Sequence, residues 1–189
     1  MSVELHPVCV AKFTYAFHCL DIDGTGALDA TDFLRLADRL AGSRGWSSTD
    51  PRLSVIRQGL VDYWEMLCML CDHDGSGTVD LEEFLLFHHM MIAETHEFQE
   101  PPPWALAMVE TLLEALDADG DGRIDRGEYA AYLWAIRSTM NAETAFRKLD
   151  LDGSGFLELK ELRELMASYL TSTVPEEPGN YLLTGGWPR

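Results

Sequence analysis

One twelve-residue pattern occurs four times in this 189-residue chain, and it constrains the fold more than any other feature. Each copy has Asp at positions 1 and 3, Gly at positions 4 and 6, a large aliphatic residue at position 8, and an acid at positions 9 and 12. The copies are DIDGTGALDATD from Asp21, DHDGSGTVDLEE from Asp72, DADGDGRIDRGE from Asp117 and DLDGSGFLELKE from Asp150. Chance does not produce four such matches in one register, so the chain is built from a repeated unit.

Apolar residues at helical spacing flank each copy of the loop. Before the third copy they include Leu112, Leu113 and Leu116, and after it Tyr129 and Tyr132. Residues three and four positions apart lie on one face of an α-helix. We therefore predict an all-α fold in which helix, acidic loop and helix recur four times. The four units form two pairs, with a tiny β-bridge between the paired loops.

The spacing of the oxygen donors in each loop has a chemical reason. Calcium is a hard cation that takes six to eight oxygen ligands at about 2.3–2.6 Å. A twelve-residue loop surrounds it when positions 1, 3 and 5 supply side-chain oxygens, position 7 a backbone carbonyl, position 9 a bound water and position 12 a closing carboxylate. Gly at position 6 allows the sharp turn. This is the EF-hand loop.

The predicted metal ligands follow from these positions. In the four loops they are Asp21, Asp23, Thr25, the Ala27 carbonyl and Asp32; Asp72, Asp74, Ser76, the Thr78 carbonyl and Glu83; Asp117, Asp119, Asp121, the Arg123 carbonyl and Glu128; and Asp150, Asp152, Ser154, the Phe156 carbonyl and Glu161. Asp29, Asp80, Asp125 and Glu158, at position 9, are expected to act through a water molecule.

The four loops differ in their donors. The third has carboxylates at positions 1, 3, 5, 9 and 12, which predicts high calcium affinity. The first ends with Asp32 where the others end with Glu. Aspartate is one methylene shorter and reaches an ion less easily with both oxygens, which favours the smaller, six-coordinate Mg²⁺. We expect up to four Ca²⁺ ions, with Mg²⁺ as a second candidate ion, especially at the first loop.

These loops account for the acidity of the chain. It has 32 Asp+Glu and 14 Lys+Arg, for a formal net charge of -18. Positions 1, 3, 5, 9 and 12 hold 17 of the acids, and the 15 that remain nearly balance the basic residues. Such a charge disfavours nucleic acids and anionic membranes as partners. We expect calcium ions as the partner and a monomeric chain, since nothing in the sequence indicates a protein partner.

The expected location is the cytoplasm. The first residues lack the basic and apolar regions of a secretory signal, and no stretch is long and apolar enough to span a bilayer. The four cysteines, Cys9, Cys19, Cys68 and Cys71, are expected to be free thiols in a reducing compartment. Cys68 and Cys71 end a predicted helix, where the negative dipole disfavours thiolates, so we expect core packing there and no redox role.

The connectors between the loops divide the chain. Asp50-Pro51 marks an N-cap and a first helical position, from which a helix should run to about Cys71. Pro101-Pro102-Pro103 stops any helix. We predict an N-terminal pair over 1–98 with loops 21–32 and 72–83, a Pro-rich linker at 99–104, a C-terminal pair over 105–174 with loops 117–128 and 150–161, and a tail at 175–189 that packs on the core.

With four such loops, these connectors and the tail segment Pro178–Leu183, the chain resembles the sarcoplasmic calcium-binding proteins. The bacterial calerythrin-like members look closest. The resemblance implies a compact fold of two EF-hand pairs packed face to face around one shared core. It also implies a role as an intracellular Ca²⁺ buffer or store. In that family one loop, often the second, tends to be degenerate, but here the loop from Asp72 to Glu83 is intact.

We do not expect an enzyme, since no Ser/His/Asp arrangement or phosphate-cradling loop is visible. Two other functions stay open. The first is a Ca²⁺ sensor that exposes an apolar groove to a partner protein. Methionines cluster around the second unit and could line such a groove, although the tail could cover it. The second is a luciferin-binding, photoprotein-like protein. It would need His, Trp or Tyr near the last helix, where Tyr169 is the one such residue between Leu162 and Leu170.

Overall fold

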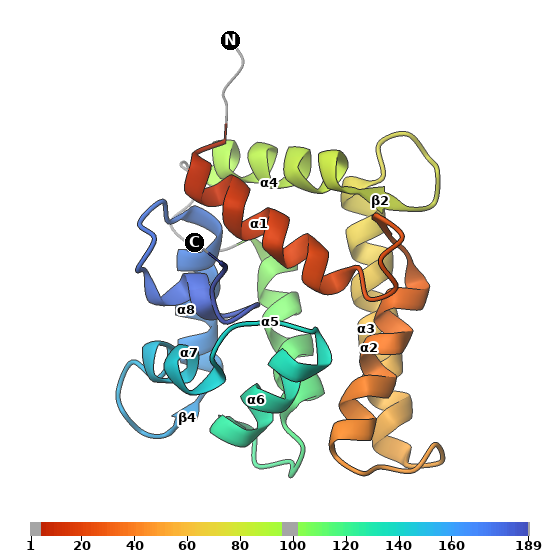
Figure 1. Cartoon of the computed structure of the whole chain (residues 1–189), viewed down its shortest axis with the longest axis vertical. Helices are drawn as coiled ribbons and strands as arrows, with labels where there is room; N and C mark the ends of the chain where they lie inside the picture. Colours follow the sequence, from red (N-terminus) through yellow and green to blue (C-terminus); the bar gives the residue numbers. More distant parts are fainter. Residues whose placement is uncertain (1–4, 96–101, 189) are drawn as a thin grey trace.

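The computed structural model describes residues 5–95 and 102–188, and within them the chain forms eight α-helices, four two-residue strands and a short 3₁₀ helix (Figure 1). In chain order these are α1 (Pro7–Leu20), β1 (Ala27–Leu28), α2 (Ala30–Ser43), α3 (Pro51–Cys71), β2 (Val79–Asp80), α4 (Leu81–Thr95), α5 (Pro103–Leu116), β3 (Ile124–Asp125), α6 (Arg126–Ala135), α7 (Ala142–Leu149), β4 (Phe156–Leu157), α8 (Leu159–Thr171) and η1 (Pro178–Tyr181). The predicted alternation of helix, acidic loop and helix is confirmed.

The helix boundaries follow from local sequence signals. α3 begins where Asp50 accepts a hydrogen bond from the Arg52 amide at 3.0 Å, with Pro51 in the first turn, as the sequence predicts. The helix ends at Cys71, directly before the second loop. α1, α5 and α7 likewise end on the residue before the first Asp of a loop. Each acidic loop therefore starts from a fixed helix end.

The paired loops meet through the predicted β-bridges. β1 pairs antiparallel with β2, with Leu28 opposite Val79. β3 pairs antiparallel with β4, with Ile124 opposite Leu157. All four of these position-8 side chains are 0–1% exposed, so each bridge carries an apolar contact that holds two metal loops back to back.

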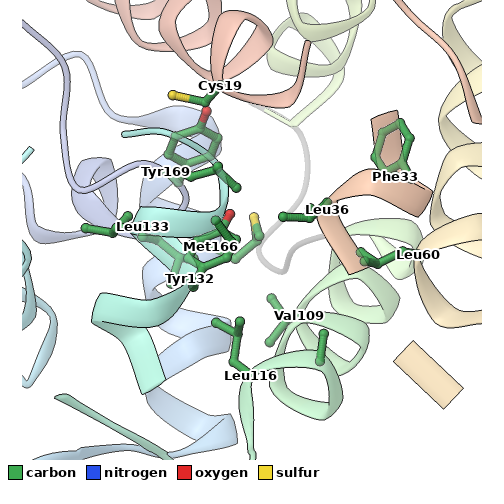
Figure 2. Close-up of a cluster of buried hydrophobic side chains, with 14 of the residues drawn as sticks. Cys19, Phe33, Leu36, Leu60, Val109, Leu116, Tyr132, Leu133, Met166 and Tyr169 are labelled. Carbon is green, nitrogen blue, oxygen red and sulfur yellow. The ribbon is translucent and has the colours of Figure 1, made fainter. Parts of the chain in front are cut away.

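One hydrophobic core joins the two halves of the molecule. Figure 2 shows side chains from the first half, such as Leu36 and Leu60, converging with Val109, Leu116 and Met166 of the second half. α3 contacts α5, α2 contacts α6, and α4 contacts α8. In Figure 1, α5 accordingly lies between the α2–α3 pair and α8. The all-α fold with two EF-hand pairs and tiny β-bridges is confirmed.

A buried lysine also links the two halves. Lys12 of α1 is 0% exposed, and its ammonium donates to the carbonyl oxygen of Tyr169, to that of Ser172 at 2.9 Å and to Asn180 Oδ1 at 3.0 Å. These acceptors lie at the end of α8 and in the tail, and a cation is favourable at a helix C-terminus. α1 is thereby fixed to the opposite end of the chain.

The tail after α8 folds back on the second half. Leu182 is 1% exposed, and Tyr132 Oη and Ser138 Oγ donate to the carbonyl oxygens of Leu183 and Thr184 at 2.8 and 2.6 Å. Of the predicted segments, residues 1–4 and 96–98 of the N-terminal pair, residues 99–101 of the linker, and Arg189 lie outside the described residues. Among the helices that are described, none combines the length and apolarity that a membrane span requires.

Candidate metal centres

Each acidic loop gathers the side chains of positions 1, 3 and 12 into one cluster. In all four, one carboxylate oxygen from each of the three residues lies within 4.8 Å of the other two. The groups are Asp21, Asp23 and Asp32; Asp72, Asp74 and Glu83; Asp117, Asp119 and Glu128; and Asp150, Asp152 and Glu161. Three carboxylate oxygens at this separation, contributed by one short loop, form the centre of an oxygen cage suited to a hard divalent cation.

Positions 5 and 7 face the same side of the loop. The hydroxyl of Thr25 donates to the Ala27 carbonyl at 2.9 Å. The same contact recurs between Ser154 and the Phe156 carbonyl at 3.1 Å, and it is also made in the second loop. In the third loop Asp121 stands at position 5 and forms an ion pair of 3.1 Å with Arg123. In the first, second and fourth loops the predicted oxygen ligands at positions 5 and 7 are therefore adjacent in space.

Glycine at position 6 closes the turn and supports the acid at position 1. Gly122 has φ 81° and donates its amide to Asp117 Oδ2 at 2.8 Å. The other three loops repeat this contact at 2.9–3.0 Å, with φ between 80° and 87°. Residues with a Cβ atom rarely adopt a positive φ because the Cβ clashes with the backbone, so glycine is required at this position. In the second loop the Gly77 amide is the main cause of a lowered pKa at Asp72.

The acid at position 12 holds the loop closed from both ends. In the third loop, Glu128 accepts from the Ala118 amide at 2.5 Å and from the Asp125 amide at 2.8 Å. Positions 2 and 9 donate to the position-12 carboxylate in every loop. Burial is the largest cause of a raised pKa at Glu128 and at Asp32, and neighbouring acids add to it. A bound cation would offset that electrostatic cost.

The acid at position 9 has a role that the sequence analysis missed. In the third loop Asp125 accepts from the Glu128 amide at 2.8 Å, so it is the N-cap of α6 and forms a capping box with Glu128. Asp80 accepts from the Glu83 amide at 2.9 Å in the same way. The signal was available, because an acid three residues before Asp or Glu at a helix start is a capping-box pattern. The predicted role of position 9 through a water molecule stays a prediction.

One carboxylate oxygen of the fourth loop is satisfied by no donor in the described part of the protein. Asp150 Oδ1 is buried and has no hydrogen-bond partner among the described residues. Its other oxygen accepts from the Gly155 amide at 3.0 Å. A buried, unpartnered carboxylate oxygen is costly unless a cation or donor satisfies it. Asp150 belongs to the cluster with Asp152 and Glu161, so the residues present fit a divalent cation.

The shorter acid of the first loop reaches the same contacts as glutamate does elsewhere. Asp32 accepts from the Ile22 amide at 2.8 Å and from the Asp29 amide at 3.1 Å, and it is 1% exposed. Its cluster with Asp21 and Asp23 meets the same 4.8 Å limit as the other three. The shorter side chain therefore closes the first loop through the same amides, at positions 2 and 9, that glutamate contacts in the other loops.

Two other candidate groups do not form ligand sets. Burial chiefly raises the pKa of Cys71 to about 12, and the Cys68 thiol points to Asp72 Oδ2 at 3.7 Å, so this C-x-x-C pair stays protonated. All four cysteines are free thiols. His88 is 7% exposed and its ring lies 4.1 Å from that of Phe13 and 4.4 Å from that of Phe84, centroid to centroid. It is a core residue.

Comparison with known families agrees with this geometry. The chain matches the EF hand domain model over residues 141–169 and a second EF hand model over residues 71–88 and 108–134. These ranges contain or overlap the second, third and fourth loops. Together with the four acidic clusters, they indicate calcium binding.

The chain is also similar to complete calcium-binding proteins. It is 26% identical to sarcoplasmic calcium-binding proteins II, V, VI and VII of Branchiostoma lanceolatum over 91% of this chain and 92% of theirs. It is 27% identical to calerythrin of Saccharopolyspora erythraea over 75% of this chain and 80% of calerythrin. The resemblance seen in the loops therefore extends across most of the molecule.

Solved structures share the fold. A sarcoplasmic calcium-binding protein from amphioxus superposes with a TM-score of 0.73 at 22% identity, over 96% of this chain and 98% of that one. A coelenterazine-binding protein from Renilla muelleri superposes with a TM-score of 0.72 at 17% identity, over 94% and 95%. At these identities the likeness shows the fold alone. The chain has an EF-hand fold and is similar along most of its length to the sarcoplasmic calcium-binding proteins and to calerythrin.

Proposed function

We propose that this protein is a non-enzymatic calcium buffer that captures up to four divalent ions in its four EF-hand loops. The predicted ligands at positions 1, 3, 5, 7 and 12 hold the ions, and position 9 acts through water. The observation that carries the proposal is that all four loops bring three carboxylates together while the tail is already docked on the C-terminal pair. A buffer needs the first feature and has no use for a free target groove.

The contacts of the tail support a buffer over a sensor. Tyr129 Oη donates to the Tyr181 carbonyl, Tyr132 Oη to the Leu183 carbonyl at 2.8 Å, and Leu182 is buried. Hydrogen bonds to the peptide backbone of the tail resemble those made to a bound peptide. A partner helix would have to displace these contacts before it could bind at this surface.

Ion capture is coupled to the electrostatics of the fold. Without an ion, each loop holds four or five acids in one small volume, and their repulsion opposes folding. Bound cations remove that repulsion, so ion binding stabilises the folded chain. Four Ca²⁺ would change the formal net charge from -18 to -10. The chain should therefore be more compact and more stable in calcium than in a chelator.

The fluorescence of the dye ANS during a calcium titration tests the buffer role, because ANS reports exposed apolar surface. We expect ANS fluorescence to fall as calcium is added, since the metal-free chain compacts. A rise in ANS fluorescence on calcium binding, together with a target that co-purifies only in calcium, would refute the buffer role. A chain that binds no calcium at all would refute the metal sites themselves.

One observation supports the sensor as a second candidate. Met69 on α3 is 77% exposed, and Leu86 and Met90 on α4 are 43% and 47% exposed, so apolar side chains contribute to the surface of both helices of the second EF-hand. If this surface widens with calcium, Met69→Gln with Met90→Gln will reduce the ANS signal of the loaded protein. Val55→Gln is the matched control, because Val55 is 60% exposed on the same α3 helix and far from the loop in sequence.

A luciferin-binding role has less support. The apolar cavity between the halves is lined by residues such as Leu36, Tyr132 and Tyr169 and has a volume of about 70 Å³. That is about half the volume of an engineered cavity that accommodates benzene. A luciferin with several rings would need the core to open. Binding of coelenterazine, followed by light emission when calcium is added, would restore this role.

The remaining parts of the proposal concern ion selectivity, binding partners, oligomeric state and cellular location. Asp32 makes the first loop the one most open to Mg²⁺. The excess of acids supports a protein without nucleic-acid or membrane partners. We also propose a monomer in the cytoplasm, which is consistent with the free thiols.

A further inference from the structure

Helix α2 leaves the first loop and ends on the third EF-hand. Arg44, which caps α2, donates from Nη1 to the Ala115 carbonyl at 2.9 Å and from Nη2 to the Leu116 carbonyl at 2.6 Å. These are the last two residues of α5, and the next residue is the first metal ligand of the third loop, Asp117. Arg44 therefore fixes the point at which the third loop begins.

A second arginine of α2 holds the other helix of the same EF-hand. Arg39 Nε donates to the Ala135 carbonyl at 2.5 Å, and Nη2 donates to the Trp134 carbonyl at 3.0 Å. Both carbonyls belong to the last turn of α6, and the Arg39 guanidinium also lies 4.9 Å from the centre of the Trp134 ring. One helix of the first EF-hand thus contacts the ends of both helices of the third.

The first turn of α3 adds to the contact with the third loop. Arg52 Nη1 donates to the carbonyl of Ala118, at position 2 of the third loop, at 3.3 Å. The guanidiniums of Arg52 and Arg44 lie 4.1 and 4.9 Å from the centre of the Trp46 ring, which places this ring beside both cations. The connector between the first two EF-hands is therefore packed on the entrance of the third loop.

These contacts satisfy carbonyls that a helix end leaves free, and they place cations where the helix dipole is negative. By themselves, these arginine contacts would only stabilise the fold. The further consequence arises because ion binding in an EF-hand can change the relative position of its two helices. α2 is the exit helix of the first EF-hand, so any displacement of α2 reaches both helices of the third EF-hand through Arg39 and Arg44.

We propose that ion binding at the first and third loops is thermodynamically coupled through α2, with Arg39 and Arg44 as the positioning residues. The inference rests on the proposed function, because it requires both loops to bind ions. The first and third loops belong to different EF-hand pairs and share no β-bridge, so the arginines provide a direct link across the halves. Coupling is reciprocal: each loop changes the affinity of the other by the same factor.

The test measures calcium affinity loop by loop. The amides of Gly26 and Gly122, at position 6 of the first and third loops, serve as NMR reporters during calcium titration of the full chain. Asp21→Asn removes a ligand of the first loop. When both arginines are present, we expect Asp21→Asn to weaken calcium binding at the third loop by roughly 5-fold or more, which is in the range of typical allosteric coupling. Asp117→Asn should weaken the first loop by the same factor.

The arginines are tested in the same assay. In the double variant Arg39→Gln and Arg44→Gln, we expect Asp21→Asn to change the affinity of the third loop by less than about 2-fold, because the coupling is lost. Arg57→Gln is the control, since Arg57 pairs with Asp38 of α2 at 2.5 Å inside the first half. It should leave the coupling intact. A purely structural role would lower stability in the double variant and leave the coupling factor unchanged.

A measurement on the metal-free protein gives an independent readout. Hydrogen exchange at the ends of α5 and α6 should be faster in the double arginine variant and unchanged in Arg57→Gln. Loops that bind calcium independently in the wild type, or a coupling factor that survives the double variant, would overturn this inference alone. Failure of both loops to bind calcium in the wild type would overturn the proposed function as well.

Discussion

Gly179 offers the sharpest test of how the tail is docked, because it lies directly against the backbone of α8. A Cβ at this position would lie 2.6 Å from the Tyr169 amide nitrogen and 2.7 Å from Ser168 Cβ, and it would also clash with the Leu165 carbonyl oxygen. All three contacts are closer than real Cβ atoms tolerate, and two of them involve backbone atoms that cannot rotate away. Gly179→Ala must therefore displace the tail or strain it in place.

The size of the effect follows from comparing these two outcomes. Releasing the tail would expose Leu182, which costs about 1.5–3 kcal/mol. It would also break hydrogen bonds from Tyr129, Tyr132 and Ser138, at about 0.5–1.5 kcal/mol each. Accommodating one extra methyl group in a packed site costs about 1–3 kcal/mol. Strain is the cheaper outcome, so we expect the tail to stay docked and the free energy of unfolding to fall by about 1–3 kcal/mol.

Urea and thermal unfolding at a fixed free calcium concentration measure this loss, since ligand concentration itself changes stability. For a chain of this length a loss of 2 kcal/mol lowers the melting temperature by roughly 4–8 °C. Gly42→Ala is the matched control, because Gly42 lies in α2 with open space around it, and alanine should raise helix stability by up to about 1 kcal/mol. If the two variants have equal stability, the tail is not docked as described.

Three further predictions concern an ion site and two buried groups. Asp32→Glu should raise the Ca²⁺ over Mg²⁺ preference of the first loop, measured by competition titration; an unchanged preference contradicts the role given to the shorter side chain. His88 is buried, which lowers its pKa to about 4, so the wild type should lose up to about 3 kcal/mol of stability through this group as pH falls from 6.5 to 4. His88→Phe should lack that component of the pH dependence, and parallel pH profiles of the two proteins in urea unfolding would refute it. Lys12→Met leaves buried carbonyl and amide oxygens without their donor and should lower the free energy of unfolding by at least about 1–3 kcal/mol, whereas a more stable variant would show that the ammonium is a net cost.

The oxygen clusters and the helices around them could be predicted from the sequence because both depend on short-range order. The ligands of one cluster, such as Asp117 and Glu128, are at most eleven positions apart, and the loop turns on glycines whose positions are visible in the sequence. The helix faces repeat every three to four residues. The sequence of Asp50 and Pro51 likewise marks the start of α3 without any knowledge of the tertiary fold.

The contacts between the halves could not be predicted in this way. Lys12 interrupts the apolar face of α1, and a lysine there is indistinguishable from a solvated one until Tyr169 and Asn180 are brought beside it. Arg39 and Arg44 also have the pattern of surface residues. Their acceptors are main-chain carbonyls more than 70 residues away, and every residue has such a carbonyl. No side-chain pattern therefore identifies the partner in advance.

The capping boxes at positions 9 and 12 have a consequence for how these loops can change in length. The Glu128 carboxylate is at once a member of the oxygen cluster and the group that accepts the amide of Asp125 at the start of α6. A one-residue insertion between these two positions would break the ion cage and misplace the first turn of the helix together. The spacing between positions 9 and 12 is thus fixed by two separate requirements. Neither requirement applies to the connectors between the loops, so their lengths can vary. The loop starts are accordingly 51, 45 and 33 residues apart, while every loop has twelve residues.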